Sequence, residues 1–196
     1  MKAIKNPCKS MSCNYFIIQT GFLKGKPSPL KLWTHGCDGV LVGCGNRDVL
    51  DEVLTAFFAS RQCPGGAIRA AMDWALQQAR ARQVVISGFH SPLDQSVLKV
   101  LIAADSPAVV VLARPLQGAK LPPEWVEPLA KGQMTVLSGV TTAGRLTLQL
   151  AYERNAQVAR LATKIVVSHA SPGGSLAEQL GQWRLDGRQV EVLLAS

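Results

Sequence analysis

Residues 84–113 read VVISGFHSPLDQSVLKVLIAADSPAVVVLA, in which two short apolar runs enclose a longer segment with helical spacing. The runs at Val84–Ser87 and Ala108–Ala113 show no polar alternation, which is typical of strands buried on both faces. Between them, Ser91 and Pro92 mark a helix start, because serine caps the first turn and proline fits its first position. The segment therefore predicts the strand, helix and strand of a βαβ unit.

The same alternation continues on both sides of this unit. The other predicted strands are Leu54–Ala59, Thr135–Ser138, Ile165–Ser168 and Val190–Leu194. The predicted helices are Gly66–Arg82, Pro92–Ala103, Thr147–Ala162 and Ser175–Asp186, the first with an apolar stripe of Ile68, Ala71, Met72, Ala75 and Leu76. Six strands joined by crossover helices predict an α/β fold, a doubly wound and mostly parallel sheet of the Rossmann type in three layers, α/β/α.

Length and charge divide the chain into two parts. At 196 residues and 21.0 kDa it has the size of one domain, which we place at residues 45–196. Residues 1–44 form a basic N-terminal segment with candidate edge strands at Tyr15–Thr20 and Val40–Val42. Residues 1–37 hold six lysines and no acidic residue, and they account for most of the net charge of +8. Such an arm suits either salt-sensitive phosphate contacts or a solvated terminus.

The sequence shows no sign of membrane insertion or secretion. The longest apolar run, Ala108–Ala113, is far shorter than the roughly 20 residues of a membrane span. The five cysteines have no regular spacing, which is typical of free thiols in a reducing compartment, and we expect a cytoplasmic protein. A zinc site is disfavoured, because its ligand pairs would be spaced too loosely in Cys8, Cys13, Cys37 and Cys44.

Several predicted strands end in loops whose small and basic residues suit phosphate. In an open α/β sheet, ligands bind beyond the carboxyl ends of the strands, where the strand order reverses. Free N–H groups at a helix start attract anions, and glycine lets a ligand approach the backbone. The candidates in these loops are Ser60, Arg61, Gly65, Gly66, Gly88, His90, Ser91, Ser171, Gly173, Gly174 and Ser175. Arg114 and Arg154 would add charge, and Asn155 would orient a phosphate or its loop.

No complete catalytic set accompanies these loops. His90 suits a phosphate donor or a general acid, although a lone histidine at a helix start is more often structural. Cys63 lies near a predicted helix start and Arg61, which would lower the pKa of its thiol, but no base partner is evident. The G-x-G-x-x-G fingerprint is missing after Leu54–Ala59, and no acidic residue ends Val84–Ser87. NAD and FAD are therefore disfavoured, and we expect no cofactor.

Short motifs in the order of the strands carry a family resemblance. They are Gly45-Asn46 with Val49-Leu50, Ala59-Ser60-Arg61, Ser87-Gly88 with Leu93-Asp94, Arg154-Asn155, and Gly174-Ser175-Leu176. Together they resemble the Rossmann-like domain of the DNA-processing protein A (DprA/Smf) family, within the nucleotide-binding group that also holds the "lonely guy" proteins. The chain departs from the family pattern at Ala59 and Pro92, where the family has glycine, and the second arginine of the family's Arg-Asn-Arg motif is either replaced by Gln157 or absent.

The resemblance implies binding of single-stranded DNA in a basic phosphate-binding pocket during DNA processing and uptake. It also implies loading of a RecA-type recombinase during transformation. Related domains often pair, and an exposed edge strand would be the place for a homodimer contact, although the sequence does not determine the oligomeric state.

Two other functions stay open. A small-nucleotide sensor is favoured by the nearly neutral charge of residues 38–196. A nucleotide 5'-monophosphate phosphoribohydrolase is the enzyme alternative, because Pro172-Gly173-Gly174 resembles the "lonely guy" loop, yet Glu178 comes one residue too early for its catalytic acid. We expect a DNA-binding protein without catalytic residues.

Overall fold

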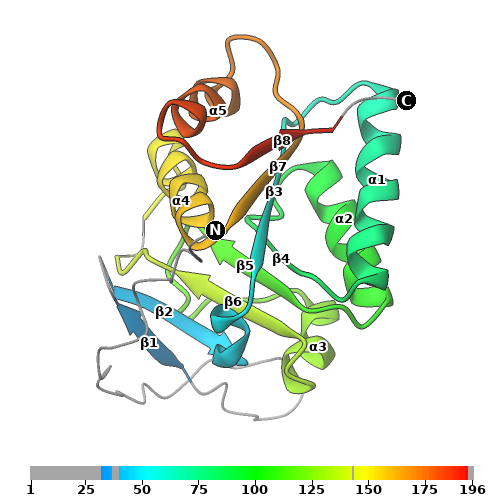
Figure 1. The fold of residues 1–196 in the computed structure, drawn as a ribbon. Helices are drawn as coiled ribbons and strands as arrows, with labels where there is room; N and C mark the ends of the chain where they lie inside the picture. The colour runs from blue at the N-terminus through cyan, green and yellow to red at the C-terminus, as the bar shows by residue number, and fades with distance from the viewer. Residues whose placement is uncertain (1–31, 37–39, 143, 194–196) are drawn as a thin grey trace, which may run out of the picture.

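The structure, a computed structural model, describes residues 32–36, 40–142 and 144–193 and folds them into one eight-stranded sheet with helices on both faces (Figure 1). The strands are β1 Trp33–Gly36, β2 Val40–Gly45, β3 Leu54–Ala59, β4 Val84–Ser87, β5 Ala108–Leu112, β6 Met134–Ser138, β7 Lys164–His169 and β8 Val190–Val192. The helices are α1 Gly65–Arg80, α2 Pro92–Ala103, α3 Val126–Ala130, α4 Leu148–Leu161 and α5 Ser175–Leu185, with 3-10 turns η1 Arg47–Asp51 and η2 Pro123–Trp125.

The strand order is β1-β2-β6-β5-β4-β3-β7-β8. The six strands from β6 to β8 in this order are parallel, whereas β1 and β2 pair antiparallel at the β6 edge. From β3 the chain builds outward through β4, β5 and β6, then returns to place β7 and β8 on the other side of β3. The strand order therefore reverses beside β3. This arrangement confirms the predicted α/β fold with a doubly wound, mostly parallel sheet.

The two faces of the sheet carry separate cores. Phe57 points to the face covered by α1 and α2 and stacks on Trp74, with ring centroids 5.0 Å apart. Phe58 points to the face covered by α4 and α5 and stacks on Trp183 at 4.7 Å. Because successive strand residues face opposite sides, two neighbouring phenylalanines in β3 anchor both helix layers.

Most predicted elements have nearly the predicted bounds. Strands buried on both faces and helices with clear starts account for this agreement, and the Ser91 cap of α2 is present as a full capping box with Asp94. The stripe predicted for α1 is wrong at two positions, since Ile68 is 43% exposed and Leu76 is 44% exposed. The reason is that Trp74 stacks on Phe57, so the side of α1 that carries Trp74 faces the sheet. The buried face of α1 consists of Ala67, Ala71, Trp74, Ala75 and Ala79.

The antiparallel pair β1 and β2 extends the sheet beyond β6. The predicted strand at residues 40–42 lies within β2, and the candidate strand at residues 15–20 lies outside the described residues. Trp33 of β1 packs across Gly43 of β2, where a Cβ atom would lie 2.4 Å from the indole ring. The Trp33 indole also donates a hydrogen bond to the Gly45 carbonyl at 3.1 Å. A glycine at position 43 is thus what allows this ring to lie flat on the strand.

Replacement of Gly45 tests the turn that joins β2 to the rest of the sheet. Its φ is +94°, and a Cβ atom would lie 2.3 Å from the Met134 carbonyl oxygen. We expect Gly45→Ala to lower the free energy of unfolding by more than about 2 kcal/mol, because backbone strain and a backbone clash add together. The control is Gly118→Ala, whose φ of +72° has open space around it and whose cost should be about 1 kcal/mol. Equal losses in urea denaturation would contradict the steric argument.

Candidate functional site

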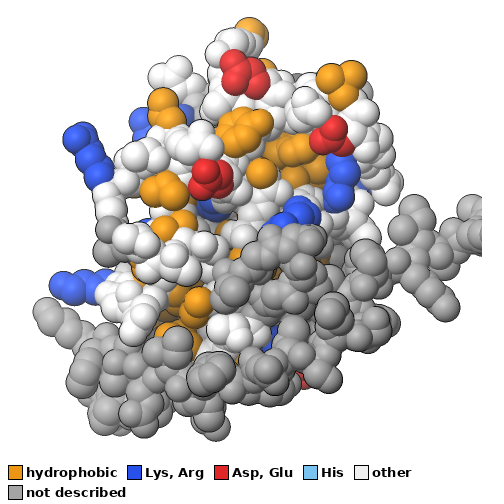
Figure 2. Space-filling view, turned by 90° about the vertical axis from the view of Figure 1, so that its left-hand side faces the viewer, with side chains coloured by type: hydrophobic (Ala, Val, Ile, Leu, Met, Phe, Trp, Pro, Cys, Tyr) orange, Lys and Arg blue, Asp and Glu red, His pale blue; other side chains and the backbone are white. Residues whose placement is uncertain are grey.

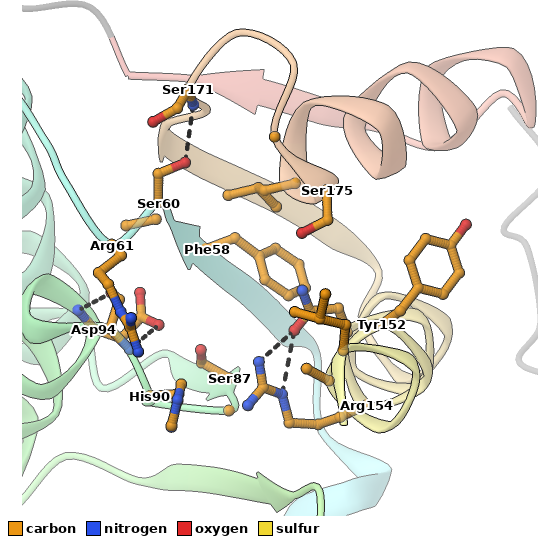
Figure 3. Close-up of a pocket in the computed structure, with 18 of the residues that line it drawn as sticks. Phe58, Ser60, Arg61, Ser87, His90, Asp94, Tyr152, Arg154, Ser171 and Ser175 are labelled. Atoms are coloured by element: carbon orange, nitrogen blue, oxygen red, sulfur yellow. Dashed lines mark hydrogen bonds between the residues drawn. The ribbon is translucent and has the colours of Figure 1, made fainter. Parts of the chain in front are cut away.

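A cavity of about 380 Å³ opens at the carboxyl ends of β3, β4 and β7, where the strand order reverses (Figure 3). Residues that follow these three strands line it together with one side of α4. This is the position at which open α/β sheets bind their ligands. The fold therefore brings together loops that are more than 100 residues apart along the chain.

Ser60 ties the loop after β3 to the loop after β7. Its backbone N–H donates to the His169 carbonyl at 2.9 Å, and its hydroxyl oxygen accepts from the Ser171 N–H at 2.9 Å. The ladder between β3 and β7 is irregular at the Phe58/Ala59 step, just before this contact. Such an irregularity re-aims the chain at the end of a strand. Because the hydroxyl acts as an acceptor here, its proton is left for a ligand.

The loop after β4 is held in a strained but bonded conformation. Phe89 is buried and has a φ of 44°, and its N–H donates to the Ser87 hydroxyl at 3.2 Å. Next to it, the Ser91 hydroxyl accepts from the Asp94 N–H at 3.0 Å while the Asp94 carboxylate accepts from the Ser91 N–H at 3.1 Å. These bonds fix the loop from both ends and leave His90 between them on the pocket side.

Arg154 enters the pocket from α4 with its guanidinium already oriented. Its Nε and Nη2 donate to Asn155 Oδ1 at 3.2 and 2.8 Å, and Asn155 Nδ2 donates to Gln179 Oε1 at 2.9 Å. Gln179 is 1% exposed and donates in turn to the Tyr152 carbonyl at 2.9 Å. A Cβ atom on Gly88 would lie 2.5 Å from Arg154 Nε, so glycine is needed for this side chain to cross the loop.

The electrostatic environment of the pocket combines two arginines with one buried acid. Burial raises the pKa of Asp94 from 3.8 to about 6, against the opposing effects of the Ser91 hydrogen bonds and the Arg154 charge. Burial also lowers the pKa of His90, and the charges of Arg154 and Arg61 lower it further, which favours the neutral imidazole. The pKa of Arg154 falls through burial as well, opposed by Asp94. The two arginine charges that act on His90 would also attract an anion in the pocket.

Most of the predicted binding residues meet in this pocket. Those that line it are Ser60, Arg61, Gly88, His90, Ser91, Arg154, Asn155, Ser171, Gly174 and Ser175. Four predicted residues are not among the lining groups, namely Gly65, Gly66, Arg114 and Gly173. Arg114 follows β5, two strands away from β3, and donates to the Lys120 carbonyl at 3.2 Å. The two glycines begin α1, and Gly173, with a φ of +70°, forms the turn before α5.

The expected activation of Cys63 is wrong in direction. Burial raises the pKa of its thiol, and the charge of Asp94 raises it further. The thiol donates to the Ser60 carbonyl at 3.2 Å, which gives it a structural contact beside the pocket. Glu178 is exposed on α5 and does not line the pocket, so the acid considered for the phosphoribohydrolase alternative is not at this site.

Sequence reasoning missed the wall that α4 contributes. Leu148, Ala151 and Tyr152 line the pocket from its first turns, and Phe58 lines it from β3. Apolar residues at helical spacing are usually core, so no sequence signal separates them from buried positions. The sequence motifs include Asp94 only as a family feature, whereas the structure shows that it lines the pocket and that its carboxyl is buried there.

Within residues 32–36, 40–142 and 144–193, no cluster of three or more His, Cys, Asp or Glu side chains is placed to hold a metal ion. Three cysteines of the zinc site weighed above lie outside that range. Among the same residues, no helix has both the length and the apolar character needed to cross a bilayer.

The comparison with protein families agrees with this geometry. The model of the family described as DNA recombination-mediator protein A matches residues 26–181, which is most of the chain. The chain belongs to this family. The predicted resemblance to DNA-processing protein A is thereby confirmed. No curated protein matches the chain by sequence.

Solved structures show the same fold at low identity. DNA processing protein A from Streptococcus pneumoniae matches with a TM-score of 0.66 and 19% identity over 80% of this chain. The chain spans 56% of the length of that protein. A structure from Helicobacter pylori, described as showing a single-stranded DNA binding mode of DNA processing protein A, matches with a TM-score of 0.66 and 13% identity, over 89% of this chain and 79% of that one. The molybdenum cofactor binding protein of Rippkaea orientalis has a TM-score of 0.51 at 10% identity, over 72% of this chain and 76% of that one.

Asp94→Asn tests the pH dependence that the buried carboxyl gives to folding. The folded-state pKa of about 6 lies above the ordinary 3.8, so the folded state holds the proton more tightly. This contribution is present at low pH and is lost as the pH rises through about 6. Between about pH 4 and about pH 7.5, the stability of the native protein relative to Asp94→Asn should fall by about 2 kcal/mol. A stability difference that does not change with pH in urea denaturation would contradict the assignment.

Gln179→Leu tests the buried hydrogen-bond chain behind Arg154. The substitution removes the partners of Asn155 Nδ2 and of the Tyr152 carbonyl, and we expect a loss of about 1–3 kcal/mol in the free energy of unfolding. Gln182→Leu is the control, because Gln182 is exposed on the same helix and donates to Asp186 at 2.7 Å. The control should cost less than about 0.5 kcal/mol. Similar losses for both variants would mean that the buried chain adds little.

Proposed function

We propose that this member of the DNA recombination-mediator protein A family binds single-stranded DNA through phosphate contacts in the pocket beside β3. The observation that carries the proposal is the convergence of Arg61 and Arg154, from different elements, on a cavity that also holds His90. Family membership supports the same conclusion, as does the single-stranded DNA binding mode named for the Helicobacter pylori relative. Residues 32–193 carry little net charge, so the basic character at this site is local.

The contacts offered to a phosphate differ in kind. Arg154 is held through Nε and Nη2 by Asn155, which keeps the other edge of its guanidinium for a phosphate oxygen. Arg61 is exposed at the mouth of the pocket, so its charge is available to a phosphate of the DNA there. Helix α5 begins at Ser175 with no side-chain cap, and Gly174 and Ser175 line the pocket, so its N-terminal N–H groups suit an anion.

We propose a cytoplasmic location, as the sequence predicts, and a contact with a RecA-type recombinase, as family membership suggests. For self-association, the partly exposed edge strand β8 is the candidate surface, because no other strand among the described residues pairs with its outer backbone groups. We propose no catalytic residue and no cofactor.

Arg61→Ala tests the placement of the DNA. The dissociation constant for a fluorescein-labelled oligodeoxythymidine should rise about 10-fold at about 50 mM salt. The slope of log affinity against log salt between about 50 and about 200 mM should fall by about 1. The control is Arg80→Ala, since Arg80 is exposed at the far end of α1 and should change neither value measurably. The measurement is fluorescence anisotropy.

Competition by AMP separates DNA binding from a nucleotide sensor. Salt-sensitive oligonucleotide binding that AMP does not displace supports the proposal. Unchanged affinity in Arg61→Ala would remove the pocket from the DNA path. If the protein binds AMP but no oligonucleotide, the proposal is wrong and the protein is a small-nucleotide sensor instead.

A further inference from the structure

The pocket contains a buried carboxyl that the proposed phosphate contacts do not use. Among the described residues that line the pocket, Asp94 is the one acid, and it is 6% exposed. Its Oδ2 accepts from the Ser91 N–H at 3.1 Å, whereas Oδ1 is buried without a hydrogen bond to any described residue. An unpartnered buried oxygen makes the ionised carboxylate costly, and a bound proton removes much of that cost.

Asp94 differs in its surroundings from the acids at the surface. On the face that α4 and α5 cover, acidic side chains lie in solvent among basic and hydrophobic ones (Figure 2). Water and salt screen such charges, so a ligand in the pocket would hardly change their protonation. Asp94 is shielded from water and lines the cavity itself, so its protonation depends on what the cavity holds.

The ionisable groups near Asp94 come from α4 and from the loops after β3 and β4. Arg154 points from α4 toward the side of the pocket that carries Asp94 and His90 (Figure 3). Cys63 and Arg61 belong to the loop after β3, and burial together with the charge of Asp94 raises the pKa of the Cys63 thiol. The residues of α5 that line the pocket have no charge. The other charged side chains of α1 and α2 are exposed, namely Arg69, Asp73, Arg80 and Lys99.

Arg154 links Asp94 to a bound phosphate. Burial raises the pKa of Asp94, and the charge of Arg154 opposes that shift. The same guanidinium is the proposed phosphate contact, so a bound phosphate would offset the charge that favours the ionised carboxylate. Two anions in one buried site disfavour each other, and the carboxylate is the one that can take up a proton.

His90 responds with the same sign. Burial lowers the pKa of its imidazole, and the charges of Arg154 and Arg61 lower it further. A phosphate beside these arginines would offset their effect and favour the protonated imidazole, which can donate a hydrogen bond to it.

The direction of the pH effect follows from linkage between proton binding and DNA binding. The pKa of Asp94 is about 6 before any ligand arrives, and a phosphate would raise it further. At a pH around or somewhat above that value, the complex would therefore hold more protons than the free protein. The affinity for DNA is then highest at low pH and falls as the pH rises through this range.

We propose that the binding of single-stranded DNA in this pocket is coupled to proton uptake by the buried Asp94 carboxyl, to which His90 adds, so that affinity falls from mildly acidic to mildly alkaline solution. The proton comes from solvent and goes to a carboxylate oxygen, and no covalent bond to the DNA forms. The inference rests on the proposed function and adds to it the regulation of the same site.

The test is isothermal titration calorimetry with an unlabelled oligodeoxythymidine. This probe is chosen because neither its bases nor its internal phosphates titrate in the range of interest. The native protein should bind about 5-fold or more tightly at about pH 6 than at about pH 8. At one intermediate pH, the binding heat should differ between two buffers of different ionisation enthalpy, and this difference measures the proton uptake.

Asp94→Asn should bind DNA more tightly than the native protein at about pH 8 and should lose most of the pH dependence, because a carboxamide resembles the protonated acid. The matched control is Asp73→Asn, which removes the same charge from an exposed position on α1 and should keep the native pH profile. His90→Gln should keep the part of the pH dependence that comes from Asp94. Thermal unfolding at both pH values checks that each variant is folded.

The results distinguish this inference from the function on which it rests. DNA binding that does not change with pH, or a pH profile that Asp94→Asn leaves unchanged, overturns the coupling while DNA binding itself stands. If the native protein binds no oligonucleotide at either pH, the proposed function fails and the coupling fails with it. If Asp94→Asn does not fold, the proton uptake of His90→Gln decides: uptake that persists supports Asp94, and uptake that disappears overturns its role.

Discussion

Phe57 and Phe58 point to opposite faces of β3, and each stacks on a tryptophan from a different helix layer. Trp74 of α1 and Trp183 of α5 are the partners, so one dipeptide joins two layers that are otherwise separated by the sheet. Strand β3 also lies next to the point at which the strand order reverses. The position of every loop at that edge therefore depends on how firmly β3 is held. Burial of large aromatic rings on both faces supplies that constraint.

The pocket is built by cross-links between segments that begin at this edge. Ser60 bonds the loop after β7, Gly88 leaves room for Arg154, and Asn155 connects that arginine to a fully buried glutamine on α5. Each contact is individually modest, but together they hold a guanidinium in place before any ligand arrives. A site organised in this way loses little conformational freedom on binding an anion. Burial in this pocket raises the pKa of Asp94 and lowers the pKa of His90, and the nearby Arg154 charge opposes the first shift and adds to the second.

How well the sequence predicts the structure differs from one helix or strand to the next. Strands such as β4 and β5 were predictable, because a short run of Val, Ile and Leu buried on both faces has few alternatives. The start of α2 was predictable for a local reason, since a serine, a proline and an aspartate satisfy the first turn by themselves. The inward face of α1 was not predictable, because the choice between Leu76 and Trp74 depends on which side chain finds a partner on the sheet.

The features of the candidate site also fall into those that the sequence predicts and those that only the structure reveals. The sequence by itself determined the α/β class, the loops that follow each strand, and the family motifs, because these depend on local periodicity, caps and glycines at helix starts. Only the tertiary structure decided which loops meet. It left Arg114 two strands away from the reversal point and brought Arg154 to it, and it made Leu148 and Tyr152 a rim rather than core. The physical reason is that strand order and side-chain partnership are set by contacts between residues far apart in the chain, which leave no mark in any local pattern.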